Sequence, residues 1–142
     1  MKIAIRYYTR SGNTERLANA IAEELGVTAE DVTVPLDEKT DVLFLGSSVY
    51  AGGVDKSVKE FIETNKENIG EIVNISTAAL VRSTYKKVKK LAEKYGVKMA
   101  EEEFHCRGAF AIFHKGRPNE KDLDDVKAFA KKYIEEKTEK TE

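Results

Sequence analysis

A run of small and polar residues near the N-terminus has the composition of a phosphate-binding turn. The run comprises Thr9, Arg10, Ser11, Gly12, Asn13 and Thr14. Its hydroxyl groups, its amide and the N–H groups at the start of a following helix can all donate hydrogen bonds to a phosphate, and Gly12 lets the backbone curl inward. The alternative interpretation is a polar turn that only caps the helix.

The same run lacks the sequences that bind larger nucleotides. It does not end in Gly-Lys followed by Ser or Thr, and no Gly-x-Gly-x-x-Gly of a dinucleotide fold is present in it. We therefore expect a site that holds a single phosphate group.

Three other residues with reactive side chains indicate no further chemistry. His105 and Cys106 are adjacent, so on a strand they would point to opposite faces, which argues against a metal site that also uses His114. Nothing in the sequence supplies an orienting base that would make Cys106 a nucleophile. We expect no metal site and no catalytic residue.

Apolar periodicity predicts the elements that must position the phosphate turn. Short apolar runs predict strands at residues 3–8, 32–34, 42–45, 72–75 and 102–113. Helical spacing predicts helices around residues 17–25, 54–62, 85–95 and 119–134, with Gly26 and Gly96 as C-terminal caps and Asn119 as an N-terminal cap. Residues 136–142 carry no large apolar group, so we expect a single domain over residues 1–135 and a frayed polar tail.

Strands and helices that alternate in this way predict a three-layer α/β sandwich: a five-stranded parallel sheet of order 2-1-3-4-5 with helices on both faces. Ligands of such sheets bind beyond the carboxyl ends of the strands, where the strand order reverses. The loops after Tyr8, Leu45 and Ile75 are therefore the expected site.

Composition excludes several classes of partner and location. The 142 residues have a formal net charge of −1, so no overall field attracts nucleic acid or an anionic membrane. No apolar run approaches the ~20 residues that cross a bilayer, and Arg6 interrupts the N-terminal run where a signal peptide would be apolar. The single cysteine suits a reducing compartment, and we expect a cytoplasmic monomer.

The motifs resemble those of a known family. Tyr8–Thr14 resembles the phosphate loop of flavodoxins and flavodoxin-like FMN proteins, and residues 46–53 are similar to the family's loop that borders the flavin ring. Cys106–Gly108 and Lys115–Asn119 resemble the closing strand and helix start of many bacterial and archaeal members. The likeness covers nearly the whole chain and implies a flavodoxin-like fold with FMN as the cofactor.

The resemblance also implies which residues contact FMN. Tyr50, with Val49 beside it, would form a wall of the ring slot, although Tyr50 could instead pack against the second helix. The Ala51-Gly52 peptide matches the peptide whose carbonyl turns toward the flavin N5, although many flavodoxins have glycine at the first of these positions. The implied cofactor-binding set is Thr9, Arg10, Ser11, Gly12, Asn13, Thr14, Ser48, Val49, Tyr50, Ala51, Gly52, Thr77, Ala78 and Ala79.

The third loop departs from the family pattern. It lacks an aromatic residue and acidic character, so only the backbone groups of Thr77, Ala78 and Ala79 are expected at the pyrimidine edge of the flavin. Arg82, Lys86 and Lys87 follow this loop. Cations near the flavin N1 would favour an anionic hydroquinone and raise the reduction potential, whereas the alternative for these residues is a solvated helix face.

The resemblance implies an electron carrier that shuttles single electrons through the flavin semiquinone and hydroquinone, with reductases and acceptor enzymes as redox partners. The alternative is a flavodoxin-like FMN-dependent oxidoreductase that acts on a small molecule such as a quinone or porphyrinogen. A phosphoryl-receiver domain would need an aspartate where the third strand ends at Gly46 or Ser47, and a low-molecular-weight phosphatase would need a cysteine in the first loop. Neither residue is present there.

Overall fold

The structure is a computed structural model that describes residues 1–49, 53–78, 83–108 and 116–141. Its strands are β1 (Ile3–Tyr7), β2 (Ala29–Asp31), β3 (Val42–Ser48), β4 (Ile72–Ala78) and β5 (Met99–Arg107). Its helices are α1 (Asn13–Leu25), α2 (Lys56–Asn65), the short 3-10 helix η1 (Lys66–Asn68), α3 (Tyr85–Lys94) and α4 (Glu120–Thr141).

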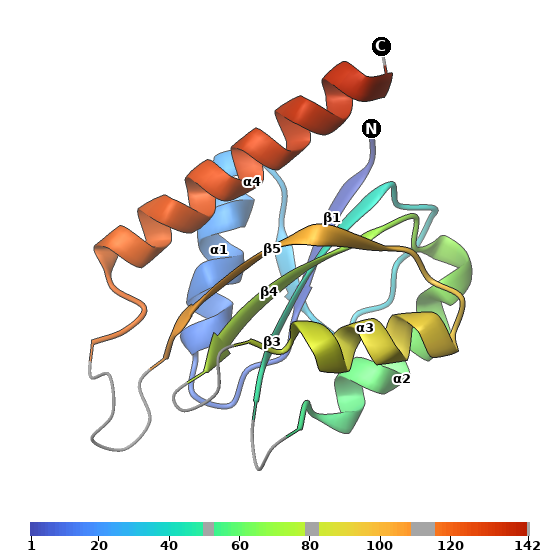
Figure 1. Cartoon of the computed structure of the whole chain (residues 1–142), viewed down its shortest axis with the longest axis horizontal. Helices are drawn as coiled ribbons and strands as arrows, with labels where there is room; N and C mark the ends of the chain where they lie inside the picture. The colour runs from blue at the N-terminus through green and yellow to red at the C-terminus, as the bar shows by residue number, and fades with distance from the viewer. Residues whose placement is uncertain (50–52, 79–82, 109–115, 142) are drawn as a thin grey trace.

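The strands form one parallel sheet of order β2-β1-β3-β4-β5, which confirms the predicted fold class and strand order. Helices α1 and α4 cover one face of the sheet, and α2 and α3 cover the other (Figure 1). Two apolar cores result, one on each face. The sheet reverses its order at β1, so the carboxyl ends of β1 and β3 flank the position where ligands of such folds bind.

The position of β3 in the sheet explains why its residues 42–45 are apolar without interruption. Leu43 and Leu45 pack in the core under α2 and α3, whereas Val42 and Phe44 pack in the core under α1 and α4. All four side chains are fully buried. A strand with a helical layer on each face has no solvent side, which removes the usual alternation of apolar and polar residues.

The second strand lies earlier than predicted, at Ala29–Asp31 and not at residues 32–34. The Asp31 carboxylate accepts a hydrogen bond from the Thr33 N–H at 2.8 Å, and the Asp31 carbonyl accepts one from the Val34 N–H at 3.0 Å. These bonds turn the chain out of the sheet. The Arg6 guanidinium then donates to the Val34 carbonyl at 2.8 Å and to the Pro35 carbonyl at 3.1 Å. At these two residues, a side chain supplies the hydrogen bonds that a neighbouring strand would otherwise make.

The prediction of a frayed tail over residues 136–142 is wrong for the residues that the structure describes, because α4 continues to Thr141. Glu71, buried at the start of β4, holds this end of the helix. Its carboxylate accepts hydrogen bonds from the Tyr133 hydroxyl and, at 2.8 Å, from Lys137 Nζ. Lys98 Nζ lies 3.3 Å from the second carboxylate oxygen. Charge pairing therefore stabilises the last turns of α4, a segment that has no apolar face.

The start of α4 agrees with the prediction for Asn119. Its side-chain oxygen accepts a hydrogen bond from the Asp122 N–H at 3.0 Å, and Asp122 accepts one in return from the Asn119 N–H at 2.8 Å. This reciprocal pair is a capping box. The fifth strand begins at Met99, three residues before its predicted start, and residues 109–113 of that prediction lie outside the described residues.

Within the described ranges, no helix combines the length and the apolar character needed to cross a membrane.

Candidate functional site

The carboxyl ends of β1, β3 and β4 lie side by side and carry the three loops predicted to form the site (Figure 1). The first loop is the phosphate turn, residues 9–14. Its Thr9 Oγ1 accepts a hydrogen bond from the Gly12 N–H at 2.8 Å, which closes the turn. Gly12 has φ 90°, in the left-handed region, and helix α1 begins at the next residue. The predicted inward curl at Gly12 is therefore present.

The start of α1 points its backbone donors toward the phosphate turn. Among the described residues, no side chain caps this helix. The acidic residue of its first turn is Glu15, and that carboxylate accepts a hydrogen bond from the Tyr7 hydroxyl at 3.2 Å. Burial, and then Glu15, raises the pKa of Tyr7, so the phenol stays protonated and keeps donating. The N–H groups at the α1 N-terminus, which no described side chain caps, carry the positive end of the helix dipole, and this favours an anion.

Three hydroxyl groups meet directly behind the phosphate turn, and we call them the hydroxyl triangle. Thr14 Oγ1 lies 2.6 Å from Ser48 Oγ and 3.0 Å from Thr77 Oγ1. Ser48 Oγ and Thr77 Oγ1 are 3.0 Å apart. Because each hydroxyl has one proton, the three can each donate once and accept once around the ring. The triangle joins the first loop to the ends of β3 and β4.

Two glycines make this close approach possible. A Cβ at Gly46 would lie 2.8 Å from Thr14 Cγ2, so a larger residue would push α1 away from β3. A Cβ at Gly108 would lie 3.0 Å from Asn13 Nδ2 and 3.1 Å from Thr77 Cβ. Gly108 therefore lets the end of β5 approach both the phosphate turn and the hydroxyl triangle.

Asp55 joins the first loop to the start of α2. Its carboxylate accepts a hydrogen bond from the Ser57 N–H at 3.0 Å and so caps α2. The pKa of Asp55 is lowered, first by Ser57, whose N–H donates to the carboxylate, and further by the Tyr8 hydroxyl and the charge of Arg10. Asp55 is thus ionised at neutral pH and interacts with Tyr8, which precedes the first loop, and with the charge of Arg10 in that loop.

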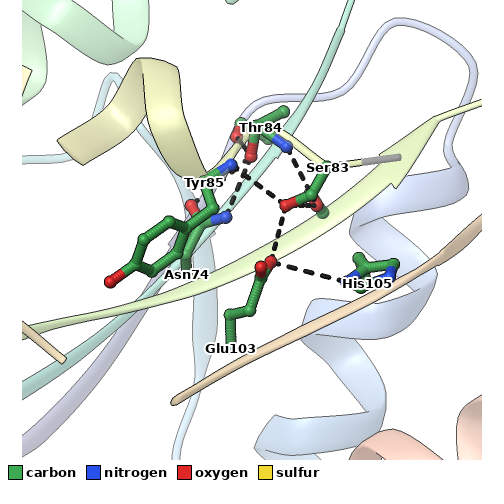
Figure 2. A network of polar contacts seen from close by, with 8 residues as sticks. Asn74, Ser83, Thr84, Tyr85, Glu103 and His105 are labelled. Carbon is green, nitrogen blue, oxygen red and sulfur yellow. Dashed lines mark hydrogen bonds and ion pairs between the residues drawn. The ribbon is translucent and has the colours of Figure 1, made fainter. Parts of the chain in front are cut away.

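A buried polar network lies on the opposite face of the sheet, where α3 begins (Figure 2). Thr84 Oγ1 accepts hydrogen bonds from Ser47 Oγ and Asn74 Nδ2, both at 3.0 Å. The side chains of Ser47, Asn74 and Thr84 have no solvent exposure. These bonds fix the entry to α3 against β3 and β4.

The network continues to β5 through Ser83. Its hydroxyl donates to Glu103 Oε1 at 2.6 Å and accepts a hydrogen bond from the Tyr85 N–H at 3.0 Å. His105 Nδ1 lies 3.6 Å from the same Glu103 oxygen, within ion-pair range but too far for a hydrogen bond (Figure 2). Contacts from two strands therefore hold the residues that follow the third loop.

Both inner strands run further than the sequence predicted. β3 ends at Ser48 and not at Leu45, and β4 ends at Ala78 and not at Ile75. Thr77 and Ala78 are thus strand residues, and the Ala78 carbonyl accepts a hydrogen bond from the Gly108 N–H at 3.3 Å. Small side chains such as these occur both in buried strands and in loops, so residue type alone did not show where the strands end.

The predicted site residues divide into three groups. The structure brings Thr14, Ser48 and Thr77 into contact, with Thr9, Gly12 and Asn13 beside them. Arg10 and Ser11 are exposed on the turn, Val49 is half-buried after β3, and Ala78 is buried at the end of β4. The remaining four, Tyr50, Ala51, Gly52 and Ala79, lie outside the described residues.

Burial raises the pKa of the Cys106 thiol to about 12, so this cysteine is not a thiolate at neutral pH. Within the described residues, no group of three His, Cys, Asp or Glu side chains lies close enough to bind a metal ion. His114 falls outside those residues.

Sequence reasoning missed the polar network around Thr84. One signal was present: Asn74 interrupts the apolar run Ile72-Val73-Asn74-Ile75. A buried amide needs hydrogen-bond partners, so a polar residue inside a strand indicates other polar groups nearby. The sequence did not show that Ser47 and Thr84 are those partners, because their contact depends on how α3 packs.

Comparison with known proteins places this architecture in a family. The family model described as a flavodoxin domain matches residues 4–141. A flavodoxin from the domain Archaea superposes with a TM-score of 0.75 at 18% identity, over 92% of this chain and 94% of that one. Flavodoxin 1 from Bacillus cereus superposes with a TM-score of 0.71 at 14% identity, over 95% of this chain and 98% of that one.

A third similar structure was solved with a cofactor. The flavoprotein in complex with FMN from Lactobacillus acidophilus has a TM-score of 0.57 at 20% identity, over 75% of this chain and 92% of that one. None of the curated proteins is similar enough in sequence to count as a match.

Proposed function

We propose, from the premise that the chain belongs to the flavodoxin domain family, that it binds FMN and carries single electrons between redox proteins. The observation that carries the proposal is the phosphate turn: residues 9–14 close on a left-handed Gly12 at the start of α1, beside the ends of β1 and β3. The FMN-bound flavoprotein from Lactobacillus acidophilus, which has the same fold, supports FMN as the ligand.

The chemistry of the donors fits a phosphate monoester. The N–H groups at the start of α1 carry the positive end of the helix dipole, and Thr9 and the exposed Ser11 belong to the turn that precedes them. The buried hydroxyl triangle lies directly behind this turn and fixes it against the ends of β3 and β4. Gly46 and Gly108 keep this group of donors compact.

FMN, when bound, supplies a ring that can take up and release electrons one at a time. Val49, half-buried after β3, and the ends of β3 and β4 would hold the ring. The chain's own contribution is to hold the phosphate, to orient the ring at the edge of the sheet and to keep water from its inner side. We propose that it does so as a monomer whose electron donors and acceptors are other proteins.

Spectroscopy and mass spectrometry of the purified protein test this function. We expect a yellow protein from which denaturation releases FMN, and a one-electron-reduced form that accumulates during photoreduction. Release of FAD, or failure of the flavin-free protein to bind added FMN, would refute the proposal.

Turnover assays separate the carrier from an FMN-dependent oxidoreductase. A carrier should exchange electrons with a reductase stoichiometrically and show no saturable turnover of quinones or porphyrinogens. Saturable, multiple-turnover conversion of either small molecule would assign the protein to the oxidoreductase class instead. The FMN-binding part of the proposal would stand in that case.

A further inference from the structure

Helix α3 has a charge unlike that of the other helices. Its ten residues contain one glutamate and five lysines, all exposed: Lys86, Lys87, Lys89, Lys90 and Lys94. The other helices are balanced or acidic, with one arginine against three glutamates in α1, two lysines against two glutamates in α2, and six lysines against seven acidic residues in α4. We call the five lysines the α3 lysine face.

The α3 lysine face is not neutralised by the rest of the protein. Lysines on α4 pair with carboxylates, such as Lys121 with Asp125 at 2.9 Å and Lys127 with Glu23 at 3.3 Å. Within the described residues, no ion pair involves a lysine of α3. Lys86 and Lys90 are four residues apart, as are Lys90 and Lys94, and like charges at that spacing destabilise an isolated helix. The face therefore keeps a positive field directed at solvent.

The polar network ties this face firmly to the candidate site. Thr84, the residue before α3, is held by Ser47 from β3 and Asn74 from β4, and both of these strands end at the site. The first lysines of the face, Lys86 and Lys87, lie in the first turn of the helix. A molecule bound along α3 would consequently be held at a fixed orientation to the ends of β3 and β4.

We propose that the α3 lysine face is the docking surface for the acidic face of a redox protein that exchanges electrons with the site. The proposal rests on the proposed function. Unpaired charges attract an oppositely charged partner over a Debye length and speed up encounter more than they strengthen the final complex. Such a surface suits a carrier that must bind and leave quickly.

A protein partner fits the face better than a membrane does. Helices that lie on anionic membranes insert apolar side chains between their basic residues. In α3, Val88 and Ala92 are buried against the sheet, and Leu91 is partly buried and packs against the same core. Among the described residues, the large hydrophobic side chains exposed to solvent are Met1 and Val34, neither of which belongs to α3.

Stopped-flow electron transfer from the reduced holoprotein tests the proposal. The acceptors are the acidic haem domain of cytochrome b5 and, in a parallel series, the basic protein cytochrome c; each ferric haem takes one electron from the reduced flavin. The test variant combines Lys86→Gln, Lys87→Gln and Lys90→Gln. The matched control combines Lys131→Gln, Lys132→Gln and Lys140→Gln, which removes the same charge from exposed positions on α4.

With the acidic acceptor, we expect the second-order rate constant of the wild type to fall as salt rises, and the test variant to be roughly tenfold slower at low salt. The control should stay within about twofold of the wild type, because its lysines lie on α4, which covers the opposite face of the sheet from α3 (Figure 1). With cytochrome c, the test variant should become faster. A change in the flavin potential would move both rates in one direction, so the opposite signs separate docking from driving force.

Three results would overturn the proposal. They are equal losses in the test and control variants, a wild-type rate that does not depend on salt, and binding to phosphatidylserine vesicles that needs the α3 lysines while the cytochrome rates do not. If the protein binds no FMN, the proposed function fails, but docking can still be tested. NMR shifts of the flavin-free protein with cytochrome b5 at low salt should then map to α3, and shifts confined to other helices would refute docking there.

Discussion

Replacing Thr14 by valine tests the link between the hydroxyl triangle and phosphate binding. Valine keeps the branched shape that packs against Gly46 and removes only the oxygen that lies 2.6 Å from Ser48 Oγ and 3.0 Å from Thr77 Oγ1. Ser48 and Thr77 remain 3.0 Å apart, so they keep one hydrogen bond with each other. Because the side chain of Thr14 has no solvent exposure, water cannot replace the missing partner.

The expected cost has two separate parts. The free energy of unfolding should fall by about 1 to 3 kcal/mol, since polar groups buried with Thr14 lose a partner. FMN affinity should fall about tenfold to a hundredfold, because the phosphate turn loses two hydrogen bonds that fix it against β3 and β4, each worth about 0.5 to 1.5 kcal/mol, and ~1.4 kcal/mol is a factor of ten. Riboflavin affinity should change little, as riboflavin has the same ring and no phosphate.

The matched control is Thr84→Val. Thr84 is as buried as Thr14 and likewise hydrogen-bonds two side chains, Ser47 and Asn74, but it lies on the other face of the sheet. This variant should lose comparable stability and should weaken FMN and riboflavin by the same factor. Fluorescence titration with both ligands, together with urea unfolding, measures each quantity. An unchanged ratio of FMN to riboflavin affinity in Thr14→Val, or an equal change of that ratio in both variants, would refute the phosphate assignment.

Three further outcomes follow from contacts elsewhere in the chain. Gly46→Ala should cost about 1 to 3 kcal/mol in urea unfolding and weaken FMN, because its Cβ would lie 2.8 Å from Thr14 Cγ2; wild-type stability would contradict this packing. Burial raises the pKa of Glu71, but hydrogen bonds from Lys137 and Tyr133 outweigh it and hold the pKa below the ordinary 4.5, so Glu71→Gln should be destabilising at pH 7. That difference from the wild type should shrink as the pH falls below about 4.5, and a difference that persists in acid would rule out charge pairing. Cys106, with its pKa near 12, should react with iodoacetamide at pH 8 roughly a thousandfold more slowly than a free thiol, and urea should restore the ordinary rate; fast labelling of the folded protein would show that the thiol is accessible and ionised.

The order of elements could be predicted because each depends on nearby residues. Apolar runs and helical spacing locate β1, β3, β4 and all four long helices, and Gly26 and Gly96 end two of those helices with φ 69° and 70° as expected. The strand β2 was misplaced because Val32, Thr33 and Val34 favour strands by type. Hydrogen bonds to Asp31 and Arg6, the latter distant in sequence, decide the conformation there. The extent of α4 also depends on a remote residue, Glu71.

The candidate site was predictable as far as its residues adjoin in sequence. The phosphate turn has a local signal, because hydroxyls, an amide and a glycine come together just before a helix. The hydroxyl triangle has none, since its members Thr14, Ser48 and Thr77 come from three elements and meet only when the sheet forms. The interpretation of the lysines after the third loop as a solvated face was also incomplete, because the sequence does not show that they form no ion pair with any other residue that the structure describes.

The distribution of polar residues along β3 and β4 explains how one sheet supports both a core and a site. Parallel pairing places Ser47 beside Ser76 and Ser48 beside Thr77, so small polar residues of the two strands collect at the same level, at their carboxyl ends. Alternation along each strand then divides them between the faces. Ser48 and Thr77 face α1 and meet Thr14, whereas Ser47 meets Thr84 at the start of α3. One band of the sheet therefore sets two positions at once, that of the phosphate turn and that of the α3 lysine face. A shift of either strand by a single residue would exchange the two sets of hydroxyls, so the strand register links the proposed cofactor site to the proposed docking surface.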